Sequence, residues 1–273
     1  MNRQQLIAQI RDKQNYLCIG LDSDEDKIPR HLLSFDDPVF EFNKAIIDAT
    51  KNHCISYKIN TAFYEARGVD GWMTLQKTID YIPETHFTIA DAKRGDIGNT
   101  SAQYAKAFFE TYGFDAITVA PYMGRDSIQP FLDYKDKWTI VLGLTSNKGS
   151  EDFEQLLVSN GSTEPQHLYE TVMEKIARWG TPENLMFVVG ATKAEHLSAF
   201  RKKYPDYFFL VPGVGTQGGS LGEVSKAALT NEGGLLVNVS RAVIYAARNE
   251  AFAEQANIVA EQYAEEMKSL FAF

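Results

Sequence analysis

The stretch HFTIADAKRGDIGNT, residues 86–100, joins two patterns that indicate how this chain folds. Its first five residues are mostly apolar or β-branched, as in a buried strand of a parallel sheet. Charged residues follow at once, from Asp91 to Asp96, and a segment with helical spacing begins at Thr100. A buried strand that leads through a charged turn into a helix is the βα unit of α/β proteins. The stretch therefore predicts a chain built from such units.

The same unit recurs along the 273 residues. Eight short runs rich in β-branched and aromatic residues are expected to be strands, at 16–21, 55–59, 86–90, 116–120, 138–144, 185–190, 207–211 and 235–239. Apolar positions three and four apart predict helices between them, at 39–52, 72–82, 100–113, 167–180 and 193–204. Gly113 and Gly180 fall where two of these helices are expected to end, as C′ glycines do.

Eight strands that alternate with helices predict an α/β protein with the (β/α)8 architecture, a TIM barrel, formed by one domain over residues 1–273. An open, doubly wound parallel sheet would show similar apolar runs, but such sheets usually have fewer strands. No linker rich in Ser, Gly or Pro divides the sequence. The longest irregular stretch, about 145–165, is expected to be an active-site loop.

Composition and charge argue against several classes of partner. The formal net charge is −9, so the surface offers no broad counter-charge to nucleic acid or to an anionic membrane. No apolar run approaches the length of a membrane span, and the first residues lack a signal region, which predicts a soluble cytoplasmic protein. Cys18 and Cys54 are expected to be buried, reduced thiols. The five histidines show no ligand spacing, so no metal site is predicted.

Polar residues at the ends of the predicted strands are the candidates for function, because barrel enzymes place their active sites there. They are Asp22, Lys58, Asp91, Lys93, Ser146, Gln217 and Arg241. Asp91 and Lys93 are two residues apart, so both side chains would project from the same face of an extended strand. The carboxylate would keep the ammonium charged and ready to donate a proton. The alternative is a solvated charged loop in which Asp96 caps the next helix.

A second signal is the segment PGVGTQGG, residues 212–219, after the seventh predicted strand. Glycines let backbone N–H groups approach a ligand, and the loops after strands seven and eight of barrels often bind phosphate. Ser240 and Arg241 follow the eighth strand, where a helix is expected to begin, and this arrangement suits a phosphate dianion. A tight turn and a surface arginine are the alternative. The match to the dinucleotide motif GxGxxG is weak, because Glu232 precedes a strand.

The stretch 88–100 resembles the signature of the orotidine 5′-phosphate decarboxylase family, which continues past its second aspartate with Ile, Gly and Thr. The segment 212–219 and Arg241 are similar to that family's phosphate loop. The resemblance spans most of the chain and is strongest to the longer bacterial branch. It implies a (β/α)8 barrel and a homodimer with active sites at its interface. The implied reaction converts orotidine 5′-monophosphate (OMP) to UMP and CO2 without a metal or a cofactor.

The resemblance also implies roles for residues. The catalytic array would comprise Lys58, Asp91, Lys93 and Asp96, with Asp96 supplied by the other subunit and Lys93 protonating C6 of the pyrimidine. The implied substrate contacts are Asp22 and Thr100 with the ribose hydroxyls, Ser146 with the pyrimidine edge, Gln217 with base and phosphate, and Arg241 with phosphate; Ile97, Pro212 and Ser240 complete the site. The chain departs from many members in having Ser240 in place of Gly and a longer 145–165 stretch.

The chemistry of this reaction fits the residues. Loss of CO2 from C6 leaves a carbanion with no adjacent electron sink, so fixed charge must stabilise it, and an ammonium beside C6 supplies that charge. Asp91 would disfavour the substrate carboxylate more than the transition state. One rival is a magnesium-dependent sugar-phosphate decarboxylase or aldolase of the same superfamily, which shares D-x-K-x-x-D but needs further acidic ligands. Another is a non-catalytic phosphoribosyl-binding barrel, which would need Arg241 but not Lys93.

Overall fold

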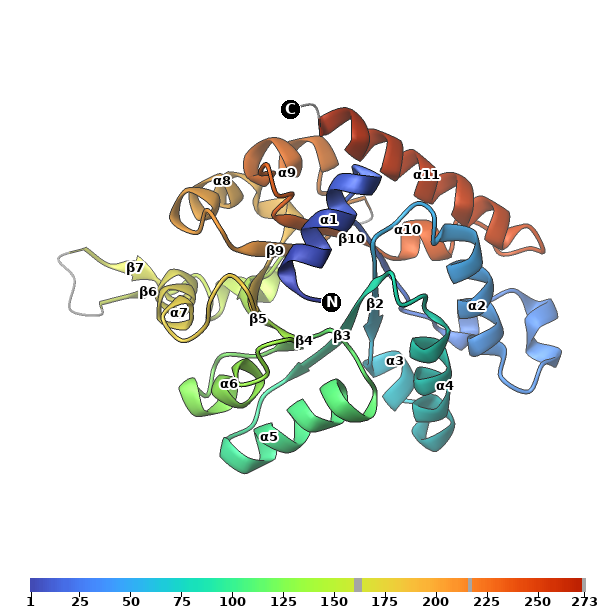
Figure 1. The fold of residues 1–273 in the computed structure, drawn as a ribbon, viewed down its shortest axis with the longest axis horizontal. Coiled ribbons are helices and arrows are strands. Elements are labelled where there is room, and N and C mark those ends of the chain that lie inside the picture. The colour runs from blue at the N-terminus through green and yellow to red at the C-terminus, as the bar shows by residue number, and fades with distance from the viewer. Residues whose placement is uncertain (160–163, 216–217, 272–273) are drawn as a thin grey trace.

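The computed structural model describes residues 1–159, 164–215 and 218–271, and within them eight parallel strands close into a barrel surrounded by helices (Figure 1). The order around the barrel is β1-β10-β9-β8-β5-β4-β3-β2. The strands are β1 Leu17–Gly20, β2 Ser56–Asn60, β3 Phe87–Arg94, β4 Ala116–Val119, β5 Trp138–Leu144, β8 Leu185–Val189, β9 Phe208–Pro212 and β10 Leu235–Val239. Each predicted strand overlaps an observed one, and the TIM barrel is confirmed.

The helices lie around the barrel, and most of them follow a strand and cover its outside (Figure 1). They are α1 Arg3–Lys13, α2 Pro38–Thr50, α3 Ala62–Glu65, α4 Gly68–Tyr81, α5 Gly98–Lys106, α6 Arg125–Leu132, α7 Leu168–Ala177, α8 Ala194–Lys203, α9 Leu221–Ala228, α10 Arg241–Ile244 and α11 Phe252–Leu270. Short 3-10 segments occupy Glu25–Lys27, Arg30–Ser34, Lys148–Glu151 and Ala191–Lys193. A π-helical turn, Ala107–Thr111, continues α5.

Helix α2 shows how local sequence and packing agree. The Asp37 side chain accepts a hydrogen bond from a backbone N–H of the first turn, and Pro38 lies in that turn, where its missing N–H costs no helical hydrogen bond. Val39, Phe42 and Ile46 are fully buried and lie three and four residues apart. The apolar stripe therefore packs on the barrel while the other face remains polar.

The two glycines predicted to end helices behave differently. Gly113 has a φ of 78° and follows the π-helical turn, so it ends that helix as predicted. The prediction for Gly180 was wrong, because α7 already ends at Ala177 and Gly180 does not have a positive φ. A Cβ at Gly180 would lie 3.0 Å from side-chain atoms of Leu132 and Leu185. The close packing of Leu132 and Leu185, which leaves little room for a side chain, explains this glycine, and a left-handed backbone does not.

Helix α1 closes the end of the barrel at which the strands begin (Figure 1). Ile10 is fully buried and packs so closely on Gly233 that a Cβ there would lie 2.8 Å from its side chain. The guanidinium of Arg3 lies 5.2 Å from the ring centroid of Phe208, the first residue of β9. At the other end, where the strands finish, loops with polar residues surround the opening of the barrel.

The stretch 145–165 contains more regular structure than predicted. The 3-10 segment Lys148–Glu151 lies within it, and β6, Leu157–Val158, pairs antiparallel with β7, Gln166–His167. Residues 160–163 lie outside the described residues. At its start, the N–H and the hydroxyl of Thr145 donate to the two carboxylate oxygens of Glu154, at 2.7 and 2.8 Å. These bonds fasten the loop to the end of β5.

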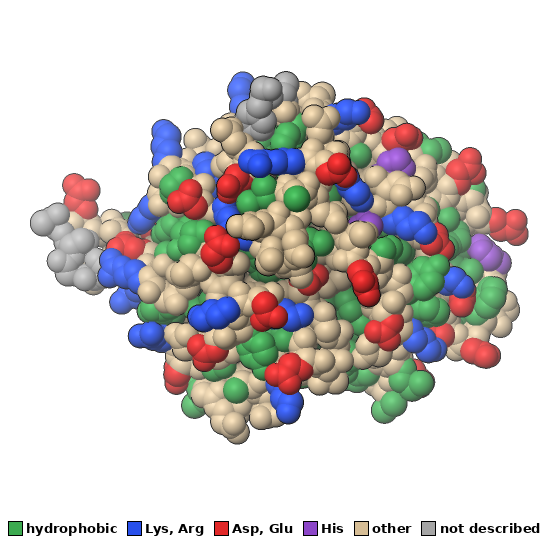
Figure 2. All heavy atoms as spheres, viewed as in Figure 1, with side chains coloured by type: hydrophobic (Ala, Val, Ile, Leu, Met, Phe, Trp, Pro, Cys, Tyr) green, Lys and Arg blue, Asp and Glu red, His purple; other side chains and the backbone are tan. Residues whose placement is uncertain are grey.

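The two cysteines are buried, as the sequence predicts, and the surface carries charges of both signs. Cys18 and Cys54 are buried and form no disulfide, and burial raises the pKa of each thiol to about 12. Figure 2 shows acidic and basic side chains interspersed on the face that carries α1. None of the described helices is both long enough and apolar enough to cross a bilayer.

The stability of the barrel should depend on the protonation of His86. This side chain is 4% exposed, its Nε2 donates to the Lys51 carbonyl at 2.7 Å, and burial together with the charge of Lys13 lowers its pKa to about 4. The unfolded chain binds the proton near pH 6.5, so this contribution to the free energy of unfolding is complete above pH 6.5 and is lost as the pH falls toward 4.

We expect His86 to account for a loss of about 3 kcal/mol in the free energy of unfolding over that interval. Urea unfolding of the parent and of His86→Gln at several pH values measures it, with His31→Gln as a control for loss of a histidine. The His86→Gln protein should show a flatter pH dependence. An unchanged slope would show that other groups cause the dependence.

Candidate active site

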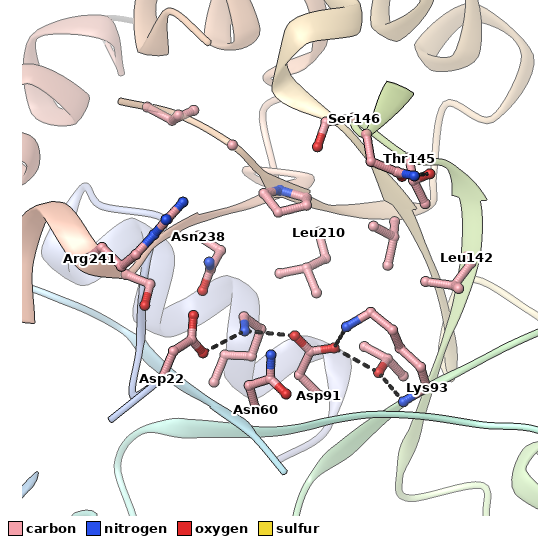
Figure 3. A pocket seen from close by; sticks show the side chains of 18 residues that line it. Asp22, Asn60, Asp91, Lys93, Leu142, Thr145, Ser146, Leu210, Asn238 and Arg241 are labelled. Atoms are coloured by element: carbon pink, nitrogen blue, oxygen red, sulfur yellow. Dashed lines mark hydrogen bonds and ion pairs between the residues drawn. The ribbon is translucent and has the colours of Figure 1, made fainter. Parts of the chain in front are cut away.

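Four charged side chains meet at the carboxyl end of the barrel, where β1, β2 and β3 are neighbours. The Lys58 ammonium lies 2.8 Å from one carboxylate oxygen of Asp91 and 3.4 Å from Asp22. The Lys93 ammonium lies 2.6 Å from the other oxygen of Asp91. Figure 3 shows the resulting row, in which acid and base alternate. We call Asp22, Lys58, Asp91 and Lys93 the charged row.

Each buried member of the charged row keeps its charge because of its neighbours. Burial opposes the charge on Lys58, yet Asp22 and Asp91 outweigh it and the pKa of Lys58 is raised above its ordinary value. Burial likewise opposes the charge on Asp91, but Lys58 and Lys93 hold the pKa of this carboxyl well below its usual range. The two lysine side chains differ in exposure, 5% for Lys58 and 50% for Lys93. Lys93 is therefore the lysine of the charged row that is more accessible to a bound molecule.

Asp91 and Lys93 lie together as predicted, but not through the regular pleat of a strand. Lys93 has a φ of 46°, in the left-handed region. The pairing of β3 with β4 shifts register between Ala90 and Arg94, so that three residues of β3 stand opposite Thr118 alone. This is a β-bulge, and it turns the two side chains toward each other.

The charged row lines a cavity of about 270 Å³ (Figure 3). Eight predicted site residues line it, namely Asp22, Lys58, Asp91, Lys93, Ser146, Pro212, Ser240 and Arg241. Figure 3 places Arg241 on one side of the cavity and Lys93 on the other. The cavity thus has the guanidinium of Arg241 at one end and the ammonium of Lys93 at the other, and the charged row runs along the wall between them (Figure 3).

The guanidinium end is built where barrel closure brings β10 beside β1. Ser240 precedes α10, which begins at Arg241 as predicted, and its hydroxyl donates to the Gly20 carbonyl at 3.0 Å. Only glycine fits at position 20, since a Cβ there would lie 2.7 Å from that of Ser240. Gly213, in the loop after β9, also lines the cavity and has a φ of 101°, a conformation that favours glycine. The predicted contact Gln217 lies outside the described residues.

Several cavity side chains were not foreseen from the sequence. They are Asn60, Thr118, Thr145, Asn147 and Asn238 and an apolar wall of Leu142, Val188 and Leu210. Thr118 and Asn238 stand within strands that were identified by their apolar character. A single polar residue in an otherwise apolar run was the signal that could have found them, because buried polar groups need a partner.

Three predicted site residues do not line this cavity. Asp96 accepts a hydrogen bond from the N–H of Ile97 at 2.8 Å. It does not cap the next helix, because the N-cap of α5 is Ile97 and no side chain bonds there. Ile97 is 53% exposed, and Thr100 is also exposed, in the first turn of α5. The structure of one chain does not bring these residues to the charged row, and their roles stay predictions.

The carboxylates beside the cavity that could bind a cation are paired with lysine ammonium groups. Lys58 lies between the carboxylates of Asp22 and Asp91. Over residues 1–159, 164–215 and 218–271 there is no group of three or more His, Cys, Asp or Glu side chains placed to hold a metal ion.

Comparison with known proteins identifies the family. Residues 15–256 match the family model described as Orotidine 5′-phosphate decarboxylase / HUMPS family. The chain belongs to this family. It is 57% identical over 272 residues to the orotidine 5′-phosphate decarboxylase of Christiangramia forsetii, with 98% of each chain covered. The resemblance inferred from the sequence is confirmed.

Solved structures agree with this family assignment. The OMP decarboxylase of Leishmania donovani matches with a TM-score of 0.84 and 36% identity over 99% of both chains. The UMP synthase of the same organism matches with a TM-score of 0.85 and 37% identity, over 97% of this chain and 56% of that chain. This chain therefore spans about half the length of the UMP synthase.

Breaking the charged row should destabilise the fold. Asp91→Asn removes the nearer carboxylate from the buried Lys58 ammonium, and we expect the free energy of unfolding to fall by about 3 kcal/mol at pH 7. Glu174→Gln is the control, because Glu174 pairs at the surface with two exposed side chains, those of Arg178 and Lys203. That change should cost about 0.5 kcal/mol or less. Urea unfolding measures both, and equal losses would contradict a special role for the buried pair.

Proposed function

We propose that this chain is a carboxy-lyase that converts OMP to UMP and CO2, with Lys93 as the proton donor to C6. The observation that carries the proposal is a cavity with Arg241 on one side and Lys93 on the other, with the charged row along the wall between them (Figure 3). A nucleotide with a phosphate at one end and a reacting pyrimidine at the other matches this polarity. Relatives of this chain at more than half identity carry the name of this reaction.

The chemical step needs charge fixed in advance. The bond from C6 to the carboxylate breaks, its electron pair stays on C6, and CO2 departs. C6 then takes a proton from Nζ of Lys93, and the lysine is later reprotonated from water. Asp91, 2.6 Å from Nζ, orients the ammonium before substrate arrives, so no reorganisation is required during the reaction. The Asp91 charge also disfavours the substrate carboxylate more than the transition state.

The remaining cavity residues bind and orient the substrate. In this proposal Arg241 and the backbone around Gly213 hold the phosphate, Asp22 binds ribose hydroxyls, and Ser146 contacts the pyrimidine edge. Pro212, Ser240 and the apolar wall enclose the ring, and Gln217 contacts base and phosphate. Binding far from C6 accelerates the reaction only if it helps to order the charged row around the substrate.

The proposal includes a homodimer in which Asp96, Ile97 and Thr100 complete the site of the other subunit. All three follow the charged row along the chain, yet they lie outside the cavity of their own chain. A second Asp carboxylate beside Lys93 would keep the ammonium charged and repel the substrate carboxylate.

Exposed apolar side chains near these residues support such an interface. Tyr122 is 88% exposed and Met123 is 46% exposed, in the loop after β4. A Cβ at Gly95 would lie 3.6 Å from Met123, which places this loop against the turn that leads to Ile97. Neighbouring exposed apolar side chains commonly mark a protein interface.

In the same proposal, residues 1–273 form one barrel domain and the stretch 145–165 is its active-site loop. The reaction uses neither a metal nor a cofactor, and the protein is cytoplasmic. The support for a metal-free reaction is that the Lys58 ammonium, and not a cation site, lies between Asp22 and Asp91.

An absorbance assay for loss of OMP in the presence of EDTA tests the function. We expect full activity with the chelator, and a loss of at least about 10³-fold in kcat for Lys93→Ala, which should still bind UMP. Lys77→Ala, a change at an exposed lysine of α4, is the control. Activity that disappears with EDTA would favour the magnesium-dependent rival. UMP binding without turnover by the parent would favour a binding protein, and normal turnover by Lys93→Ala would overturn the role of Lys93.

Mixing two inactive variants tests the shared site. Lys93→Ala and Asp96→Asn homodimers should each be nearly inactive, because each site then lacks one member of the array. Random reassociation should restore about a quarter of the sites, since half of the dimers are mixed and each has one intact site. The double variant mixed with itself is the control. If the mixture recovers no activity, Asp96 acts within its own chain.

A further inference from the structure

The backbone of Lys93 adopts a conformation that its side chain does not favour. Its φ of 46° lies in the left-handed region, which residues with a Cβ seldom occupy. The bulge also removes Lys93 from the regular ladder between β3 and β4. A residue held in this way needs contacts that fix it, and such contacts often belong to a functional site.

The hydroxyl of Thr118, on β4, makes those contacts. Its Oγ1 accepts a hydrogen bond from the N–H of Lys93 at 2.9 Å and donates one to Oδ1 of Asp91 at 3.0 Å. The same Oδ1 accepts from Nζ of Lys93 at 2.6 Å. Thr118, Asp91 and Lys93 therefore form a closed ring of hydrogen bonds. Thr118 is 1% exposed, so water does not compete freely for its hydroxyl.

The position of Thr118 in the sheet explains why the ring can form. It is the residue of β4 that stands opposite the bulge of β3. In a regular ladder a backbone carbonyl would accept from the N–H of Lys93. Here the threonine hydroxyl replaces that carbonyl, and its one hydrogen remains available for Asp91. Valine, with the same branched shape but no hydroxyl, could do neither.

We propose that Thr118 is a positioning residue for the reaction, which holds the Asp91 carboxylate and the Lys93 backbone together so that Nζ faces C6 of the substrate. This inference rests on the proposed decarboxylation. Thr118 acts through its two neighbours, and its loss changes where the ammonium stands. A displacement of about 1 Å in a catalytic group can reduce kcat on the order of 10²-fold.

A purely structural role for Thr118 is the competing explanation, and a second threonine separates the two. Thr139, on β5, is fully buried, and its hydroxyl has no hydrogen-bond partner among the residues that the structure describes. It does not line the cavity. Thr139→Val therefore replaces a hydroxyl by a methyl group in a barrel strand without breaking a described hydrogen bond or touching the charged row, and it controls for the substitution itself.

The experiment compares the parent with Thr118→Val, Thr118→Ser and Thr139→Val. For each we measure kcat and KM for OMP, the affinity for UMP, the number of UMP sites per chain and the melting temperature. The site count corrects kcat for any inactive fraction. We expect Thr118→Val to lose on the order of 10²-fold in kcat with KM and UMP affinity within about threefold of the parent. Thr118→Ser keeps the hydroxyl and should retain kcat within about threefold, as should Thr139→Val.

The outcomes separate this proposal from the one on which it rests. A parent protein that does not decarboxylate OMP refutes the proposed function. An active parent with a Thr118→Val variant of nearly normal corrected kcat overturns the positioning role. So does a Thr118→Ser variant as impaired as Thr118→Val. If Thr118→Val does not fold, Thr118→Ala takes its place under the same criteria.

Discussion

The ammonium of Lys58 is buried in the barrel, and the carboxylates of Asp22 and Asp91 make that burial possible. A lone buried ammonium would lose its proton or destabilise the fold, whereas between two carboxylates its pKa is raised. Asp91 in turn depends on Lys58 and Lys93 to remain charged. Removal of any one member takes an oppositely charged partner from at least one buried neighbour. The four side chains therefore act as one unit, and the three strands that carry them must keep their register.

Closure of the barrel brings Arg241 to the cavity that the charged row lines. The residues of the charged row come from β2, β3 and the loop after β1, and the guanidinium of Arg241 follows β10, the last strand along the chain. Because β10 pairs with β1, the two ends of the sequence meet at one cavity. Helix α1 closes the opposite end with apolar packing. Apolar packing thus closes one end of the barrel and the binding groups gather at the other, as in barrel enzymes generally.

The bulge in β3 interrupts the regular pairing of β3 with β4 at Asp91 and Lys93, two residues of the charged row. A continuous pleat would leave Lys93 with an ordinary backbone and its N–H paired to β4. The left-handed residue and the hydroxyl of Thr118 replace that arrangement, and they leave the ammonium against Asp91 at the mouth of the cavity. Charges placed before substrate arrives are the most effective form of electrostatic stabilisation, because the protein does not reorganise during the reaction.

The sequence by itself determined the eight strands, the helices α2, α4, α5, α7 and α8, and the family, because apolar runs, turn residues and the motif at 88–100 are local patterns. It also identified all four residues of the charged row, since polar residues at strand ends are visible without a structure. Only the tertiary structure decided how Lys93 reaches Asp91, that Thr118 and Asn238 enter the cavity, and that Asp96 lies outside it. These facts depend on register and packing between strands far apart in the chain, which local patterns do not specify.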